Sequence, residues 1–206
     1  MNPFWVETGT ETRLAIVPRP RGGDWLEDEV SQMKRAGVDV LVSMLEPDEA
    51  AELGLSQEAQ LCEAGGILFR SFPIPDRETP PSTASFAKFI EELRSDLHAG
   101  RSVAVHCRAS IGRSSLLLAS LLAVEGLAPG EAFRRLTVAR GLEVPDTPDQ
   151  IQYRHPTPGR AGPAAARPHP RHCRYRHRRR YRRRGGPCPT QRFHGPGRMQ
   201  NSRLPP

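Results

Sequence analysis

The sequence predicts an α/β fold, in which a central, mainly parallel sheet of about four strands carries helices on both faces. Along residues 14–140, short apolar runs alternate with stretches whose apolar residues recur at helical spacing. The last short run, residues 102–105, leads through a small-residue loop into a long apolar helical stretch. Because ligands bind at the carboxyl ends of strands in such sheets, we expect the functional site in that loop.

Each predicted strand is a short apolar run that stops at a proline, a glycine or polar residues. The strands are expected at residues 14–17, 38–42, 67–69 and 102–105. The helices are expected to follow Asp24, Pro47, Ser56 and Ser82 as starting residues, and then to span residues 113–124 and 131–140. The helix at 113–124 is apolar on all sides, so we expect it to be the buried hub of the fold.

Charge divides the chain into two parts. Residues 1–150 hold all 23 acidic residues and 15 of the 30 Lys and Arg residues, whereas residues 151–206 hold 15 arginines and no acid. The first part has the composition of a folded domain, but the second also holds ten prolines and six glycines without an apolar period. We therefore expect a folded domain at 1–150 and a disordered, basic tail at 151–206.

The four cysteines and the apolar runs indicate a compartment. No secretory signal opens the chain, and the longest apolar run, residues 116–124, is about half of a membrane span. We expect a cytoplasmic protein that contacts no membrane and has free thiols. Cys62 lies in a predicted helix and is expected to be a small buried side chain.

Residues 107–113 have the composition of a loop that binds a dianion. Cys107 and Arg113 are six positions apart, with small residues and Gly112 between them, and a helix follows. The backbone N–H groups and the helix dipole stabilise negative charge, including a thiolate at Cys107. Arg113 can bind two phosphate oxygens with its planar guanidinium, and Ser114 can donate a hydrogen bond to the sulfur when it leaves.

The string His-Cys-x5-Arg-Ser at 106–114, between a strand and a helix, resembles the cysteine-dependent protein tyrosine and dual-specificity phosphatases. The resemblance is to compact bacterial dual-specificity-like members and covers about three quarters of the chain. It implies hydrolysis of a phosphomonoester through a cysteinyl-phosphate, without metal or organic cofactor. The phosphate-binding residues implied are Arg108, Ala109, Ser110, Ile111, Gly112 and Arg113.

The family takes its general acid from an aspartate on a loop upstream of the cysteine. Asp76, in the proline-rich stretch 72–81, matches this position, and Glu78 is the alternate acid. The resemblance implies that Asp76 first protonates the leaving oxygen and then activates the water that hydrolyses the cysteinyl-phosphate. The alternative is a solvated turn aspartate, which is common in loops of this composition.

Other positions carry over from the family with smaller roles. His106 is expected to set the geometry of the cysteine loop, and Arg108 to lie at its rim. Gln150 is a candidate for the glutamine near the attacking water. The family usually has glycine where this chain has Ser110, so we expect reduced activity if that position needs a positive φ.

The tail has three interpretations. Its arginines, interleaved with Tyr175 and Tyr181, suit a nucleic-acid-binding arm, the only part of the chain for which we consider nucleic acid a partner. A metal site is a weaker interpretation, because the spacing of its members matches no zinc module: His172, Cys173, His177, Cys188 and His194. The third is a frameshift near residue 151, since this composition is typical of a GC-rich gene read out of frame.

The leading function is therefore hydrolysis of a phosphorylated protein or of a small phosphomonoester. A weakly active or inactive phosphate-binding module is the alternative, and nucleic-acid binding through the tail is the third. The sequence does not distinguish phosphotyrosine from phosphoserine, phosphothreonine, a lipid or a metabolite, and it does not indicate an oligomeric state.

Overall fold

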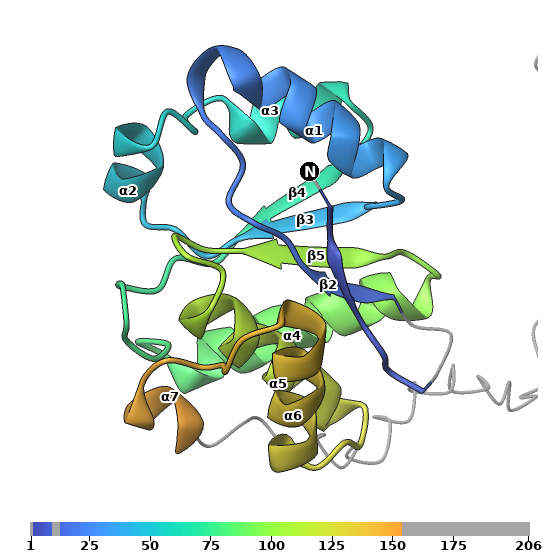
Figure 1. The fold of residues 1–206 in the computed structure, drawn as a ribbon, viewed down its shortest axis with the longest axis vertical. Helices are drawn as coiled ribbons and strands as arrows, with labels where there is room; N and C mark the ends of the chain where they lie inside the picture. The colour runs from blue at the N-terminus through green and yellow to red at the C-terminus, as the bar shows by residue number, and fades with distance from the viewer. Residues whose placement is uncertain (1, 10–12, 154–206) are drawn as a thin grey trace, which may run out of the picture. The chain divides into compact units, whose positions relative to one another are not determined.

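The computed structural model describes residues 2–9 and 13–153, which form a five-stranded sheet with helices on both faces (Figure 1). The strands, in the order β1-β2-β5-β3-β4, are β1 Phe4–Val6, β2 Leu14–Ile16, β5 Val103–His106, β3 Val40–Ser43 and β4 Leu68–Ser71. All neighbouring strands are parallel except β1 and β2. The α/β class and the four parallel strands are confirmed. β1 was not predicted, because a three-residue run is too short to show a pattern.

The helices cover both faces of the sheet. They are the 3-10 turn η1 Gly23–Trp25, α1 Leu26–Arg35, α2 Pro47–Glu52, α3 Glu58–Ala64, α4 Thr83–His98, α5 Gly112–Val124, α6 Pro129–Arg140 and α7 Pro148–Ile151. Figure 1 shows α1 and α3 on one face, and α4, α5 and α6 on the other. In the described part of the chain, no helix combines the length and apolarity that crossing a bilayer requires.

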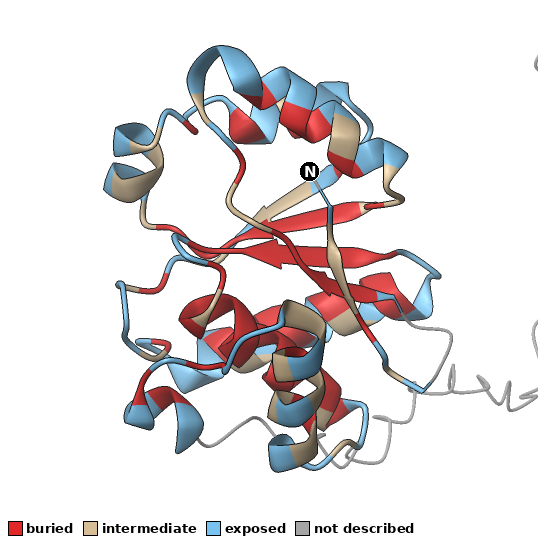
Figure 2. Cartoon of the chain, in the orientation of Figure 1, coloured by how far each residue is buried: buried red, intermediate tan, exposed pale blue. Residues whose placement is uncertain are grey.

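The core consists of one apolar cluster on each face of the sheet. The larger cluster packs α4, α5 and α6 against the sheet, and the smaller packs α1 and α3 against its opposite face. β5 lies between the two clusters and is fully buried (Figure 2). All residues of α5 except Ala123 are buried, which confirms the predicted hub. Each buried leucine of this helix contributes about 1.5–3 kcal/mol relative to an exposed one.

Two of the predicted helix starts are wrong. α1 begins at Leu26 rather than after an Asp24 cap, because the chain first makes the turn η1. That turn is fixed by a close backbone approach: the Gly23 N–H donates to the Gly54 carbonyl over 3.0 Å. Ser56 does not cap α3, which begins at Glu58. The Ser82 cap of α4 is confirmed, since its hydroxyl accepts from the Ser85 N–H over 3.3 Å.

The parallel register brings three loops to one edge of the sheet. Ser43, the last residue of β3, is in register with His106 of β5 and with Ser71 of β4. The segments that follow these strands, which end at α2, at α4 and at α5, therefore start side by side. Contacts divide the chain into units 1–162 and 163–206, so everything described belongs to the first unit. The predictions for the tail beyond residue 153 lie outside the described residues.

Candidate active site

The cysteine loop, residues 107–111, joins the buried strand β5 to α5 and is held from two sides. The Ser110 hydroxyl donates to the Val17 carbonyl at the end of β2 over 2.6 Å. Arg140 of α6 donates from Nε to the Ser110 carbonyl over 3.1 Å. Two distant elements thus fix the loop before any ligand is bound.

The family resemblance places glycine at the position of Ser110, and Ser110 has a left-handed backbone. Its φ is 55°, a conformation that costs an L residue other than glycine about 1–2 kcal/mol. The side chain is fully buried, and its hydroxyl makes the contact with Val17 described above. The serine therefore combines a strained backbone with an anchoring hydrogen bond that glycine cannot make.

Cys107 and Arg113 are brought together at the base of the loop, as predicted. Cys107 is 3% exposed and Arg113 only 1%. Burial by itself would lower the pKa of Arg113, but its hydrogen bonds to Glu49 and the charges of Cys107, Glu49 and Asp76 raise it. The guanidinium thus stays charged beside the sulfur.

Arg113 is oriented by a carboxylate that the sequence did not point to. Its Nη1 and Nη2 donate to the two oxygens of Glu49 over 2.6 and 3.0 Å, and Nη1 also donates to the Ile74 carbonyl over 2.8 Å. Glu49 belongs to the capping box of α2 and accepts from the Glu46 N–H over 3.1 Å. The capping pattern is visible in the sequence, but a contact between residues 64 positions apart is not.

Asp76 reaches the same guanidinium from the loop after β4. Its Oδ1 lies 2.8 Å from Nη2 of Arg113, and its side chain is 55% exposed. Its place beside the cysteine loop agrees with the predicted acid position. Glu78, the alternate acid, offers its backbone instead: its carbonyl accepts from Nε2 of Gln150 over 2.9 Å.

The His106 side chain contacts α3. Its Nε2 lies 3.1 Å from Oε1 of Glu58 on α3, and both side chains are buried. One helical turn further on α3, burial and then the charge of Glu58 raise the pKa of Cys62 to about 12. This pair connects the end of β5 to α3, which is consistent with the expected role of His106 in setting the geometry of the cysteine loop.

The remaining predicted residues line the loop in different ways. Arg108 is 40% exposed and pairs with Glu52 over 3.1 Å, as expected at the rim. Ala109 is exposed, whereas Ile111 is half-buried against the larger apolar cluster. Ser114 is buried, and within residues 2–9 and 13–153 its hydroxyl has no hydrogen-bond partner, so it is available to a sulfur or an oxygen.

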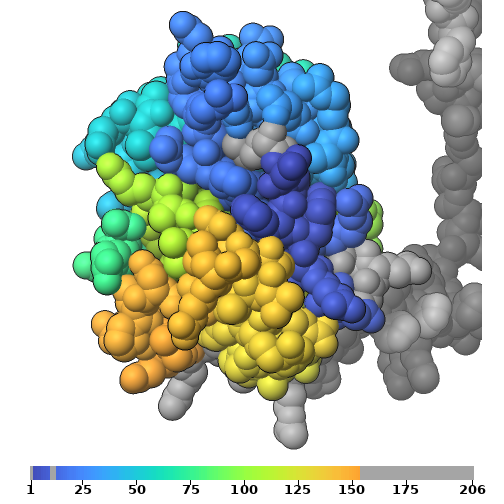
Figure 3. Space-filling model, viewed as in Figure 1, coloured from blue at the N-terminus to red at the C-terminus, as the bar shows by residue number. Residues whose placement is uncertain are grey.

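Gly112 is packed tightly against Asp146 and Gln150, of which only Gln150 was predicted near the site. A methyl group on its Cα would lie 2.4 Å from Oδ1 of Asp146 and 2.6 Å from Oε1 of Gln150. Gln150 is fully buried on α7, whose first turn is capped by the Thr147 hydroxyl. Gln150 was predicted near the site, but Asp146 was not. Figure 3 shows this segment, in orange, beside the yellow-green cysteine loop.

The fold places a cysteine and a charged arginine in one loop at the carboxyl ends of a parallel sheet. A family model described as "Tc-R-P: Polymorphic toxin system, DSP-PTPase phosphatase" matches residues 17–127. The chain belongs to this family, and the resemblance seen in the sequence is confirmed.

Named relatives agree with this family. Cyclin-dependent kinase inhibitor 3 of Rattus norvegicus is 27% identical over 132 residues, which cover 63% of this chain and 62% of the relative. Putative tyrosine phosphatase 197R of Invertebrate iridescent virus 6 is 33% identical over 89 residues, 41% of this chain and 32% of the relative. The chain therefore spans about three fifths of the length of the first relative.

Solved structures share the fold. Kinase associated phosphatase (KAP), with a serine in place of its catalytic-site cysteine, has a TM-score of 0.68 at 23% identity and covers 74% of this chain and 91% of its own. The active form of Tk-PTP has a TM-score of 0.59 at 24% identity, covering 73% of this chain and 93% of its own.

Proposed function

We propose that this chain hydrolyses phosphomonoesters on protein side chains, phosphotyrosine or phosphoserine/threonine, through a cysteinyl-phosphate on Cys107. The observation that carries the proposal is the buried Arg113 guanidinium, held beside Cys107 at the start of α5 by Glu49 and Asp76. A charged group buried at this depth needs partners, and a phosphate dianion can replace one of them, Asp76.

Substrate binding begins with an exchange of partners at Arg113. Glu49, with a 13% exposed side chain, holds both terminal nitrogens, whereas Asp76 contacts only Nη2 from an exposed loop. A phosphate bound by the N–H groups at the start of α5 competes with Asp76 for Nη2. Asp76 is thereby released from the guanidinium and becomes free to meet the leaving oxygen.

The first chemical step transfers the phosphoryl group to sulfur. The Cys107 thiolate attacks phosphorus, the P–O bond to the leaving group breaks, and protonated Asp76 gives its proton to the departing oxygen. Arg113 and the loop N–H groups stabilise the charge on the other phosphate oxygens. In the second step a water attacks phosphorus and the P–S bond breaks. The Asp76 carboxylate takes one proton of the water, and Ser114 donates to the returning thiolate.

The choice of a protein substrate follows the names of the relatives. Kinase associated phosphatase carries its partner class in its name, and it is similar in fold, with a TM-score of 0.68. A phosphorylated side chain presents a dianion on a stem, which suits a loop whose cysteine lies at its base. The proposal is therefore a protein phosphatase, although each whole relative is longer than the matched region.

A phosphate-binding module with little turnover is the second candidate. The positive φ of Ser110 favours it, because strain within the loop reduces the accuracy with which the N–H groups meet the transition state. The two candidates differ in whether product is released repeatedly.

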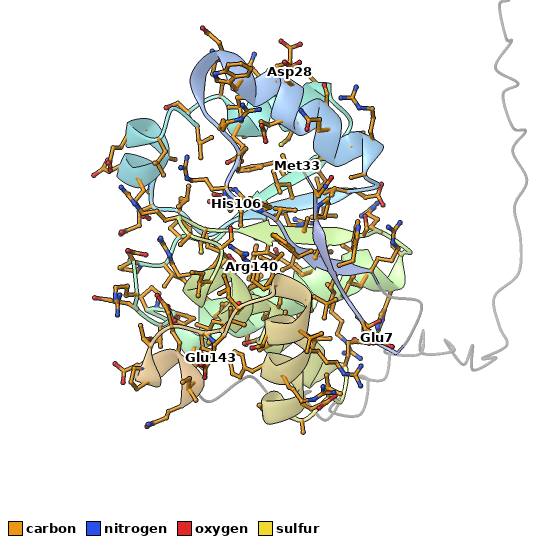
Figure 4. All side chains as sticks on the ribbon, viewed as in Figure 1. Glu7, Asp28, Met33, His106, Arg140 and Glu143 are labelled. Atoms are coloured by element: carbon orange, nitrogen blue, oxygen red, sulfur yellow. The ribbon has the colours of Figure 1, made fainter. Side chains whose placement is uncertain are left out.

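A substrate panel separates them. The unaltered chain, Cys107→Ser and Asp76→Asn are compared on an aryl phosphate and on phosphotyrosine and phosphoserine peptides, with Asp28→Asn as control. Asp28 is an exposed residue of α1 on the opposite part of the domain (Figure 4). We expect loss of turnover with Cys107→Ser, a fall of about 10²-fold or more with Asp76→Asn, and no change in the control. Turnover that survives Cys107→Ser refutes the proposal.

A further inference from the structure

We propose that Arg19 binds a second anionic group of the substrate, carried by a residue close to the phosphorylated one. The inference rests on the proposed function and names the class of phosphorylated protein that the same site selects, one with an anionic side chain beside the phosphate. Arg19 follows β2 in the chain, and the proposed mechanism gives it no role.

The segment that contains Arg19, residues 17–22, joins β2 to η1 and lies beside the cysteine loop (Figure 1). Where the segment begins, the Val17 carbonyl accepts from the Ser110 hydroxyl over 2.6 Å. Where it ends, the Gly23 N–H donates to the carbonyl of Gly54, which follows α2, over 3.0 Å. The segment therefore runs along one side of the site, from the cysteine loop to α2.

Arg19 is two residues away from this contact with the cysteine loop. Two residues of extended chain span about 7 Å at most, so the Cα atoms of Arg19 and Val17 lie within that distance of each other. The three methylene groups of the arginine side chain extend its reach further. A group bound next to a phosphate in the cysteine loop is thus within reach of the Arg19 guanidinium.

The Arg19 guanidinium has hydrogen-bonding capacity that the protein leaves unused. Among the residues that the structure describes, it forms no ion pair, and its Nε is buried without an acceptor. Its one hydrogen bond runs from Nη1 to the Pro20 carbonyl over 3.4 Å, which is long. A charged donor that is buried without a partner is costly, so an anionic acceptor from a ligand is favourable here.

Neighbouring arginines differ from Arg19 in this respect. Arg21 pairs with Glu29 over 2.6 Å, and Arg108 pairs with Glu52 over 3.1 Å. Their charges are already neutralised by carboxylates of the protein. On this side of the site, Arg19 is therefore the arginine that can offer a full positive charge to a substrate.

The opposite side of the site repels a second anion. The loop after β4 carries exposed Asp76 and Glu78, and the last described segment carries exposed Asp146 and Asp149. An anionic side chain of the substrate is therefore favoured toward residues 17–22. A planar guanidinium matches a carboxylate or a phosphate through two parallel hydrogen bonds, which a neutral side chain cannot accept in the same way.

The test measures selectivity between phosphopeptides with the full chain. One peptide has only alanine beside the phosphorylated residue, and the others carry one glutamate at one of the two positions before or after it. A last peptide replaces the best glutamate by a phosphonate side chain, a dianion that the cysteine cannot hydrolyse. The readout is the ratio of kcat/KM for an anionic peptide to kcat/KM for the alanine peptide. Any damage to the fold or the chemistry affects both values and cancels in this ratio.

We expect the best anionic peptide to exceed the alanine peptide by about tenfold in the unaltered chain, and Arg19→Gln to bring this ratio close to one. Arg19→Lys should retain part of the preference, because it keeps the charge without the planar group. Arg35→Gln, which removes an exposed arginine in the last turn of α1, is the matched control and should keep the full ratio. The order of glutamate and phosphonate tells whether the second group is a carboxylate or a phosphate, and either order supports the proposal if Arg19→Gln abolishes the preference.

Three results overturn the inference while leaving the proposed function standing. The first is equal kcat/KM for all peptides in the unaltered chain, and the second is a preference that Arg19→Gln leaves intact. The third is a preference lost in Arg77→Gln but kept in Arg19→Gln, which would place the second anion at the exposed arginine of the loop after β4. Absence of turnover of every phosphate by the unaltered chain refutes the proposed function and the inference together.

Discussion

Replacing Ser110 separates the strain of its backbone from the hydrogen bond of its side chain. Ser110→Ala retains a Cβ at a residue whose φ is 55°, so the backbone strain remains. It removes only the hydroxyl that donates to the Val17 carbonyl over 2.6 Å. Ser110→Gly removes the same hydroxyl and also relieves the strain. Ser95→Ala, which removes an exposed hydroxyl on α4, is the control.

The magnitudes follow from the contacts. Losing the donor to the buried Val17 carbonyl costs about 1–3 kcal/mol, so we expect Ser110→Ala to lower the free energy of unfolding by about 2 kcal/mol. Glycine relieves about 1–2 kcal/mol of backbone strain, which offsets part of this loss in the free energy of unfolding. Glycine also makes the unfolded chain more flexible, which lowers the free energy of unfolding by about 0.4–1 kcal/mol. We therefore expect Ser110→Gly to lose about 1 kcal/mol, half of the alanine effect.

Denaturant unfolding measures these differences, and steady-state turnover of an aryl phosphate measures their effect on the loop. We expect neither variant to be faster than the unaltered chain, because the hydroxyl anchors the loop that must receive the phosphate. A Ser110→Gly variant that is both more stable and faster would refute this reasoning. It would instead support the sequence-based expectation that serine at this position reduces activity.

Three further predictions test the surroundings of the site. Glu49→Gln, which breaks the paired contact with Arg113, should lower kcat/KM by about tenfold or more, whereas Glu52→Gln at the rim should change it by less than about twofold. Burial would raise the pKa of Glu49, but its hydrogen bonds to Arg113 and Glu46 and the charges of Arg113 and Arg108 hold this pKa below the ordinary 4.5. The ionised Glu49 therefore stabilises the fold above pH 4.5, and this stabilisation is lost as the pH falls through the lowered pKa. The difference in unfolding free energy between Glu49→Gln and the unaltered chain should shrink as the pH falls below 4.5, and a constant difference would contradict this. The pKa of Cys62 is raised to about 12 by burial and by Glu58, so this thiol should resist iodoacetamide at pH 8 in the native chain and react after denaturation. Peptide mass spectrometry measures the extent of labelling, and labelling of Cys62 in the native chain would refute the prediction.

Local sequence patterns predicted the parts of the fold that local physics controls. The β-branched and apolar run of β5 and the all-round apolar α5 identified the centre of the sheet and its hub. The spacing of Cys107 and Arg113 identified the loop between them. The helix starts at η1 and α3 could not be predicted from capping residues alone, because the approach of Gly23 to Gly54 decides the first of them.

The partners of the loop depend on contacts over long distances in the sequence. Glu49 reaches Arg113 across 64 positions, and Glu58 reaches His106 from a helix on the other face of the sheet. No spacing rule connects such residues, so only the assembled sheet reveals them. Asp146 could not be predicted for the same reason, because it lies beside Gly112 only where the chain after α6 returns to the start of α5.

The central claim is that Cys107 carries the phosphoryl group during turnover. The most direct measurement mixes the full chain with an aryl phosphate, quenches within milliseconds, and locates the phosphate by peptide mass spectrometry. We predict phosphate on the peptide that contains Cys107 and none in Cys107→Ser. Turnover with no phosphate on that peptide in either form would contradict the account.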